Sequence, residues 1–325
     1  KANTGGRAFE RLFEESVGAI EFKITLDGEE QTLSEPEVLA LLRDSNREVR
    51  IAAAESLTKG LVSSSRLLTF IFNTLVYDKA VDDRLRRYDY PEQARNLSNE
   101  LDRETVETVI GKCVEGYDLV ARYYRVKREA LGYDKLYHYD RYAPLFESKE
   151  EFSFDQAKEI VLDSFGRFSP EMRARTEEFF DKNWIDAEPR KGKRGGAFCM
   201  SITPDLHPYV LMSYLNRKED IMTLAHELGH GVHFSLSREQ TMLNFSSALP
   251  VAELASTFGE MLVFRSLVAN SSLEEKLALY AEKIENIFAT VFRQAAMYRF
   301  EQDLHRARRE QGELTTEQIG EMWQR

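Results

Sequence analysis

The chain has 325 residues, and its content of 42% hydrophobic and 30% charged residues is typical of a soluble globular protein. A formal net charge of -11 at pH 7 argues against a nucleic-acid partner, because a nucleic-acid-binding protein needs a basic surface. The two cysteines form no disulfide framework, and no apolar run reaches the length of about 18 residues that a membrane-spanning helix needs. These features predict a cytoplasmic protein without membrane contact.

Helical periodicity dominates the sequence and predicts a mainly α fold. In chain order it predicts helices near residues 5–17, 35–44, 47–84, 102–131, 154–166, 169–183, 220–236, 250–268 and 273–311, and from 315 onward. Two short hairpins interrupt them. The first is predicted at 20–33, where an alternating strand runs into the two-residue turn Asp27-Gly28. The second joins strands near 198–202 and 209–214 and forms a small β-sheet next to the helix at 220–236.

The strongest functional signal is the sequence His226-Glu-Leu-Gly-His230, which lies in the apolar run of the helix predicted at 220–236. Residues i and i+4 lie about 40° apart around a helix, so the two imidazoles project toward one point. Glu227 lies beside that point, where its carboxylate can take a proton from metal-activated water. We therefore predict that His226 and His230 bind a catalytic zinc and that Glu227 is the general base. The alternative is a pair of core histidines bonded to backbone carbonyls.

A catalytic zinc usually has three protein ligands and an open position for water, so a third ligand is expected. Glu253 is the better candidate, because Glu253, Thr257 and Glu260 form one polar stripe on the next apolar helix. The alternative is that Glu253 caps a helix or pairs with a nearby arginine. Glu260 is expected to orient a ligand imidazole rather than to bind the metal. His233 follows His230 on one short helix, where a third ligand would strain tetrahedral geometry, so we expect it to support the site or to face the substrate.

Three separated motifs point to one known group of enzymes. The first is His226-Glu-Leu-Gly-His-Gly-Val-His233, and the second is Val251-Ala-Glu-Leu-Ala-Ser-Thr-Phe-Gly-Glu260. The third is Pro189-Arg-Lys-Gly-Lys-Arg-Gly-Gly-Ala-Phe198. They resemble the H-E-x-G-H-x-x-H helix, the downstream glutamate helix and the Gly-Ala-aromatic strand of the zinc oligopeptidases of the thimet oligopeptidase and oligoendopeptidase F type. The resemblance is greatest to oligoendopeptidase F and runs from about residue 20 to the end of the chain.

The resemblance implies a helical, zincin-like metallopeptidase in which His226, His230 and Glu253 bind zinc and Glu227 is general base and acid. It also implies two lobes around a deep channel that admits short peptides. Residues 1–33 are then expected to be the end of a helical N-terminal lobe with a β-hairpin, and 34–325 the catalytic domain. Because such enzymes begin with a further helical lobe and carry a later segment rich in His and Tyr that stabilises the oxyanion, we expect a fragment that is truncated at both ends.

We therefore predict a zinc-dependent oligoendopeptidase that hydrolyses internal bonds of short peptides with one zinc ion (Zn2+) per chain. The strand at Gly196, Ala197 and Phe198 is expected to bind the peptide backbone as an added strand, and a simple core strand is the alternative. Two other functions stay open. A helical carboxypeptidase with the same motif would release single residues, and a non-catalytic fragment would bind zinc or peptide without turnover.

Overall fold

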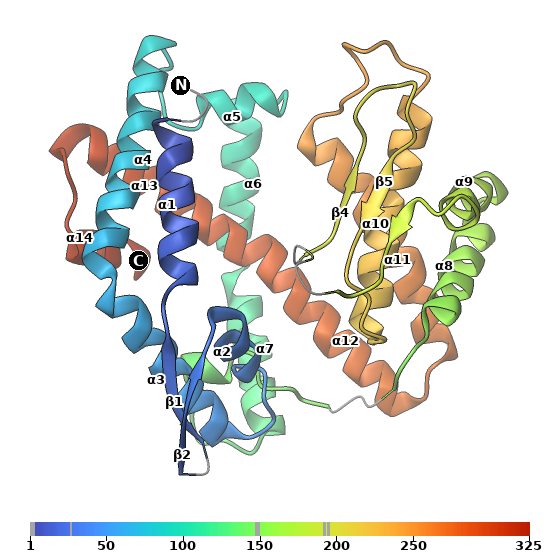
Figure 1. Ribbon diagram of the computed structural model, residues 1–325, viewed down its shortest axis with the longest axis horizontal. Coiled ribbons are helices and arrows are strands. Elements are labelled where there is room, and N and C mark those ends of the chain that lie inside the picture. The colour runs from blue at the N-terminus through green and yellow to red at the C-terminus, as the bar shows by residue number, and fades with distance from the viewer. Residues whose placement is uncertain (1–3, 27, 147–149, 191–192, 194–195) are drawn as a thin grey trace. The chain divides into compact units, whose positions relative to one another are not determined.

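The computed structural model describes residues 4–26, 28–146, 150–190, 193 and 196–325, which form a mainly helical protein with two small sheets (Figure 1). The mainly α fold predicted from the sequence is confirmed. Contacts divide the chain into two compact units, one of Lys1–Glu147 with Ala281–Arg325 and one of Ser148–Tyr280. The division into a lobe at 1–33 and a catalytic domain at 34–325 stays a prediction. No helix among the described residues is both long and apolar enough to cross a bilayer.

The first unit begins with a helix, a β-hairpin and two further helices. These elements are α1 (Gly6–Gly18), β1 (Phe22–Leu26), β2 (Glu29–Leu33), α2 (Glu35–Leu41) and α3 (Arg47–Ser63). The two strands pair antiparallel over their whole length, as the sequence predicts, whereas Asp27 of the predicted turn lies outside the described residues. β1 alternates buried and exposed positions, so Phe22 and Ile24 pack on Val38 of α2 and Ala53 of α3. The hairpin is therefore held to the helices by one apolar face.

The remaining helices of the first unit show where periodicity overestimates helix length. Those that lie wholly within this unit are α4 (Ser65–Leu85), α5 (Gln93–Ser98), α6 (Arg103–Glu115), α7 (Tyr117–Ala130), α13 (Gln294–Gln311) and α14 (Thr316–Trp323). The helix predicted at 47–84 is two helices that meet at Ser64, and the one predicted at 102–131 is two that meet at Gly116. The helix predicted at 273–311 contains a π-helical turn at Phe288–Arg293. Such short breaks barely change the apolar period, so the pattern does not reveal them.

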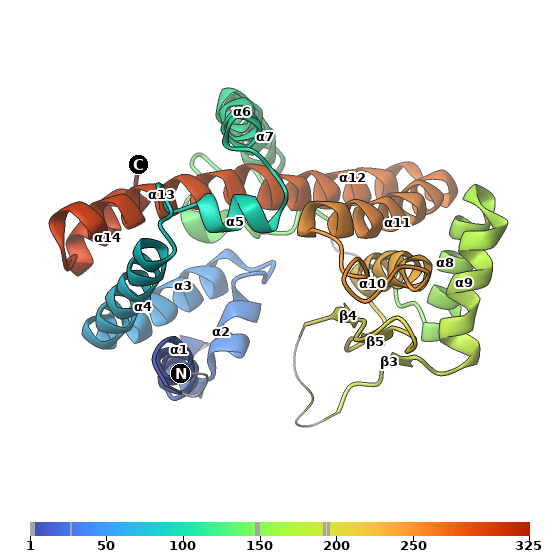
Figure 2. The ribbon, with the colours of Figure 1, turned by 90° about the horizontal axis from the view of Figure 1, so that it is seen from above.

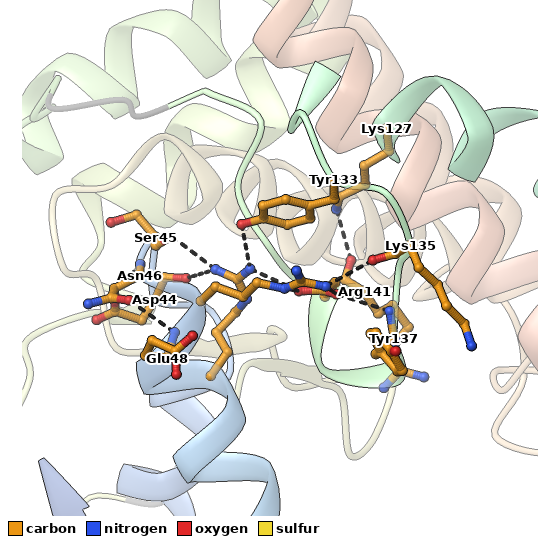
Figure 3. Close-up of polar contacts among 12 residues, drawn as sticks. Asp44, Ser45, Asn46, Glu48, Lys127, Tyr133, Lys135, Tyr137 and Arg141 are labelled. Carbon is orange, nitrogen blue, oxygen red and sulfur yellow. Dashed lines mark hydrogen bonds and ion pairs between the residues drawn. The ribbon is translucent and has the colours of Figure 1, made fainter. Parts of the chain in front are cut away.

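A buried ion-pair network joins the start of α3 to the segment after α7 (Figure 3). Arg50 is fully buried and donates to Asp140, to the hydroxyl of Tyr133 and to two backbone carbonyls. Arg47 donates two hydrogen bonds to the same carboxylate, with N···O distances of 3.0 and 2.7 Å. Burial by itself raises the pKa of Asp140, but the hydrogen bonds from these arginines hold it below its usual value. Removing one partner would leave an uncompensated buried charge in this unit.

The second unit contains one sheet and the helices with the predicted metal ligands. Its elements are α8 (Phe154–Phe168), α9 (Pro170–Asp181), β3 (Ile185–Asp186), β4 (Phe198–Met200), β5 (Tyr209–Leu211), α10 (Lys218–Ser237), α11 (Leu249–Asn270) and the first part of α12 (Leu273–Ile287). The strand order is β3-β5-β4, with β3 parallel and β4 antiparallel to the central β5. Figure 2 shows α10 between this sheet and α11. The predicted small sheet next to the H-E-x-x-H helix is confirmed.

The core of the second unit surrounds α10. Ile221, Leu224 and Leu228 of this helix are fully buried and belong to one cluster with Phe165 of α8 and Phe179 of α9. The spacing of three and four residues gives α10 an apolar stripe that packs into this core. A helix held in this way presents its polar residues at fixed positions.

Candidate metal centre

The helix α10 carries the two histidines of the H-E-L-G-H sequence. The ring centroids of His226 and His230 lie 5.0 Å apart, because residues four apart share one face of a helix. Asp220 anchors the first turn by accepting hydrogen bonds from the backbone N–H groups of Leu215 and Arg217. The start of α10 is therefore well defined upstream of the histidines.

The third predicted ligand comes from α11. Oε2 of Glu253 lies 3.4 Å from Nε2 of His226 and 3.6 Å from Nε2 of His230. One possible ligand atom from each of the three residues lies within 4.8 Å of the others. The structure thus brings together the three residues that the sequence predicts as ligands. Only 13% of the His230 side chain is exposed, against 54% for Glu253, so the group opens to solvent on the side of the carboxylate.

Glycines allow α10 and α11 to approach closely at this point. A Cβ atom on Gly229 would lie 2.7 Å from the carbonyl oxygen of Ala255 and 2.8 Å from Cα of Ser256. A Cβ atom on Gly259 would lie 3.0 Å from the carbonyl oxygen of Ala225. These neighbours are backbone atoms, so a side chain at Gly229 would push the helices apart. The glycine inside the H-E-L-G-H sequence therefore sets the separation between the two halves of the site.

Glu260, which the sequence predicts to orient a ligand, lies beside His226. Its Oε2 atom is 3.4 Å from Nδ1 of His226, whereas Glu253 faces Nε2 of the same ring. The hydrogen bond with Glu260 is the largest cause that raises the pKa of His226, and burial opposes it. A carboxylate at Nδ1 fixes the ring orientation and leaves Nε2 as the nitrogen for a metal.

Glu227 is almost fully buried, with 6% of its surface exposed. Burial raises the pKa of its carboxyl group, while the charge of His226 and a hydrogen bond with the backbone of Cys199 in β4 lower it. A carboxyl group with a raised pKa is suited to accept and release a proton near neutral pH. Burial also lowers the pKa of His230, which favours the neutral imidazole that a metal requires.

The structure does not bring His233 into the group of possible ligand atoms that the described residues form around His226. His233 is half-buried on α10, and its ring lies nearly parallel to that of Phe234, with centroids 6.2 Å apart. Its closeness to His230 is one of the smaller causes that lower the pKa of His230, after burial and His226. A role in supporting the site or facing the substrate stays a prediction.

The predicted substrate strand lies at the edge of the sheet. Gly196 has φ of 83°, in the left-handed region that favours glycine, and Ala197 follows it into β4. Phe198 pairs with Leu211 of β5, and no second strand pairs with β4 in the described part of the chain. β4 also contacts α10, the helix of the histidines. Binding of a peptide at this edge stays a prediction.

Two contacts at the site are not predicted from the sequence. Ser256 is fully buried and lies 2.9 Å from Oε2 of Glu253, and the backbone of Cys199 bonds with Glu227. The spacing of three residues on one helix could have indicated the first contact. The second joins residues of two different elements, and the sequence holds no signal for it.

The donor set fits a zinc ion. Zinc binds imidazole nitrogen and carboxylate oxygen, and three protein ligands leave one position open for water at a catalytic site. Calcium and magnesium instead prefer oxygen ligands alone, which His226 and His230 do not offer. The chemistry of the three donors therefore favours zinc over these cations.

Comparisons with known proteins assign a family to the chain. The sequence model of the family described as Peptidase family M3 matches residues 40–325 of this chain. The chain is 28% identical to the chromosomal oligoendopeptidase F of Lactococcus lactis subsp. cremoris over 298 residues, which cover 91% of this chain and 49% of that protein. It is also 28% identical to oligopeptidase PepF of Bacillus subtilis (strain 168), covering 90% of this chain and 44% of that protein. The chain thus spans about half the length of these relatives.

Solved structures have the same fold. A peptidase structure from Chlamydophila abortus matches with a TM-score of 0.84 at 26% sequence identity, and covers 98% of this chain and 54% of that chain. Oligoendopeptidase F from Enterococcus faecium matches with a TM-score of 0.70 at 21% identity, and covers 98% of this chain and 51% of that chain. Because the sequence identity to the Enterococcus faecium structure is only 21%, that likeness concerns the fold alone.

Proposed function

This chain belongs to peptidase family M3, and from that premise we propose a zinc-dependent endopeptidase that hydrolyses internal bonds of short peptides. The observation that carries the proposal is the convergence of His226, His230 and Glu253 from two helices, with Glu227 buried beside them. Relatives named oligoendopeptidase F and oligopeptidase support short peptides as substrates. Because the chain spans about half of those relatives, the activity is proposed for the whole protein.

The proposed metal ligands are Nε2 of His226, Nε2 of His230 and the carboxylate of Glu253. A zinc ion held by these three residues would supply Lewis-acid chemistry, which would polarise the carbonyl group of the scissile bond and lower the pKa of a water molecule. Glu260 accepts a hydrogen bond from Nδ1–H of His226, so that the neutral ring presents its unprotonated Nε2 to the metal. Burial keeps His230 neutral by lowering its pKa.

Glu227 is proposed as the proton carrier. Its carboxylate takes a proton from the attacking water molecule and delivers it to the nitrogen of the leaving amine. Burial of this side chain raises its pKa toward the range in which both steps occur readily. The hydrogen bond with the backbone of Cys199 holds the carboxylate against β4 while the proton moves.

The edge of β4 is proposed to hold the substrate. A peptide that adds as a strand beside Gly196, Ala197 and Phe198 is bound through its backbone, so its side chains are not selected there. β4 and Glu227 are linked through Cys199, so a peptide on this edge would lie near the proton carrier. A cytoplasmic location belongs to the same proposal.

The test uses the protein expressed from its complete natural reading frame. We expect one zinc per chain by elemental analysis, and hydrolysis of a quenched peptide at an internal bond by mass spectrometry. Glu227→Gln should retain the zinc but lose about 10²–10⁴-fold in turnover, because the amide cannot accept the proton. Glu219→Gln, a change at an exposed position of the same helix, is the matched control and should keep the parental rate.

Three other outcomes would contradict this proposal, each in a different way. Parental turnover in Glu227→Gln would show that another group carries the proton. Release of single residues from one end of the peptide would indicate a carboxypeptidase. Stoichiometric zinc without hydrolysis of any peptide in a mixed library would indicate a non-catalytic binding protein.

A further inference from the structure

Ser256 is a fully buried residue of α11 that lies one turn after Glu253. Its hydroxyl oxygen is 2.9 Å from Oε2 of Glu253 and 3.0 Å from the backbone oxygen of the same residue. Oε2 is also the atom that lies 3.4 Å from Nε2 of His226 and 3.6 Å from Nε2 of His230. The hydroxyl therefore contacts the carboxylate atom on which both imidazoles converge.

The hydroxyl of Ser256 has one proton and two acceptors within reach. Helical serines often donate to a backbone carbonyl three or four residues earlier, which would be a purely local role. A carboxylate is the stronger acceptor, because hydrogen bonds to a charged group are stronger than those to a neutral one. The shorter distance also favours Oε2 of Glu253 as the acceptor.

Glu253 needs such a restraint because 54% of its side chain is exposed. A glutamate side chain in solvent populates several rotamers, and most of them would carry the carboxylate away from the imidazoles. Ser256 itself has little freedom, since its Cα would lie 2.8 Å from a Cβ atom on Gly229 where α10 and α11 cross. The hydroxyl of Ser256 thus has a fixed position next to the more exposed side chain of Glu253.

We propose that Ser256 is a positioning residue of the metal centre. Its hydroxyl donates to Oε2 of Glu253 and holds the carboxylate where it meets Nε2 of His226 and Nε2 of His230. The three donors are then prearranged for one ion, so that less conformational entropy is lost when zinc binds. This inference rests on the proposed zinc site.

Ser256→Ala removes the hydroxyl and should weaken zinc binding by about 10–100-fold, as for other groups that hold a metal ligand. The matched control is Thr257→Val, which keeps the side-chain shape. Thr257 is exposed, and its hydroxyl donates at 2.7 Å to the backbone oxygen of Glu253 rather than to its carboxylate. The control therefore removes a hydrogen bond to the same residue without touching the ligand atom, and should bind zinc like the parent.

Zinc dissociation constants are measured by competition with a chelator, and the same proteins are loaded with Co²⁺ for visible absorption. We expect the absorption bands of Co²⁺ in Ser256→Ala to differ from those of the parent and of Thr257→Val, because the bands report ligand geometry. Circular dichroism and the unfolding midpoint of the metal-free proteins establish that the fold is retained.

Two results overturn the inference while leaving the zinc site intact. Zinc affinity and Co²⁺ bands of Ser256→Ala that equal those of the parent would show that Glu253 needs no restraint. An equal loss in Ser256→Ala and Thr257→Val would assign the effect to the helix backbone. A parent protein that binds no zinc would instead overturn the proposed metal site itself, and the inference with it.

Discussion

At the scale of single residues, two carboxylates on α11 face the two different nitrogen atoms of the His226 ring. Glu253 faces Nε2 of His226 and Nε2 of His230, whereas Glu260 faces Nδ1 of His226. The exposed fractions differ as well, with 54% for the Glu253 side chain and 20% for Glu260. A carboxylate on the Nε2 side lies where it can bind the same ion as the imidazole, whereas a carboxylate at Nδ1 orients the ring. Their positions at the ring therefore support different proposed roles, with Glu253 as a metal ligand and Glu260 as the residue that orients the imidazole.

Replacing each of these two carboxylates by its amide tests the difference between them. Glu253→Gln should weaken zinc binding more than Glu260→Gln does, because a neutral amide is a poor metal ligand. Loss of the orienting group alone typically costs about 10–100-fold in affinity or activity. Dissociation constants from chelator competition give the order of the two variants. The reverse order would make Glu260 the third ligand.

At the scale of elements, the crossing of α10 and α11 decides whether the site exists. Neither helix holds three donors alone, since His226 and His230 belong to α10 and Glu253 to α11. The crossing is close because Gly229 and Gly259 have no side chains at the contact. A wider separation of the two helices would carry Glu253 away from the imidazoles with which it would share one ion.

Gly229→Ala tests this contact. Its Cβ atom would meet the carbonyl oxygen of Ala255 at 2.7 Å, a backbone atom that cannot move without its helix. We expect overpacking to lower the free energy of unfolding by roughly 1–3 kcal/mol and to weaken zinc binding. Thermal unfolding by circular dichroism and chelator competition measure the two effects.

The control for this prediction is Gly111→Ala on α6, where an added Cβ atom meets nothing within 4 Å. Alanine is the better helix former, so this variant should be more stable by up to about 1 kcal/mol and should bind zinc like the parent. Parental zinc affinity in Gly229→Ala would show that the helix separation does not limit the site.

At the scale of the whole molecule, the two compact units hold different kinds of buried polar groups. The second unit, Ser148–Tyr280, contains all the proposed metal ligands. In the first unit Asp83 of α4 pairs with Lys79 of the same helix at 2.7 Å and with Arg309 of α13 at 2.6 Å, so the second of these ion pairs joins two helices that are distant in the sequence. His305 is half-buried near these charges. Burial, with Lys79 and Arg309, lowers its pKa to about 4.

The pKa of His305 predicts a pH dependence of the first unit. Unfolding returns the imidazole to its ordinary pKa of 6.5, so between pH 6.5 and 4 the unfolded state binds more protons than the folded state. The stability contributed by the neutral ring is therefore fully present above about pH 6.5 and is lost as the pH falls toward about 4. Lys79 and Arg309 disfavour the protonated ring, whereas Asp83 favours it.

The measurement is hydrogen exchange of α4 and α13, corrected for intrinsic rates, from pH 7 to 4. The opening free energy of the parent should fall more steeply with decreasing pH than that of His305→Gln. The difference is at most about 1.4 kcal/mol per pH unit for one proton, and smaller where solvent screens this partly exposed ring. The amides of α10 should show no difference between the two proteins. Equal slopes in α4 and α13 would contradict the prediction.

The sequence by itself determined the features that depend on residues close together in the chain. Helix geometry alone places His226 and His230 on one face with Glu227 beside them, and the same rule gives the stripe of Glu253 and Glu260. The mainly α character and the first hairpin follow equally from local periodicity and turn residues. These features are predictable because neighbouring residues decide them.

Only the tertiary structure decided which faces meet. Periodicity shows that α10 and α11 each have an apolar face, but packing sets the glycine contact that brings Glu253 to His226. The same holds for Asp140, which pairs with Arg47 across 93 positions of the sequence. The sheet order β3-β5-β4 could not be predicted from the sequence either, because β3 has only two residues and is too short to show an alternating pattern of apolar side chains. An apolar face specifies that a partner exists, and only close packing selects which one.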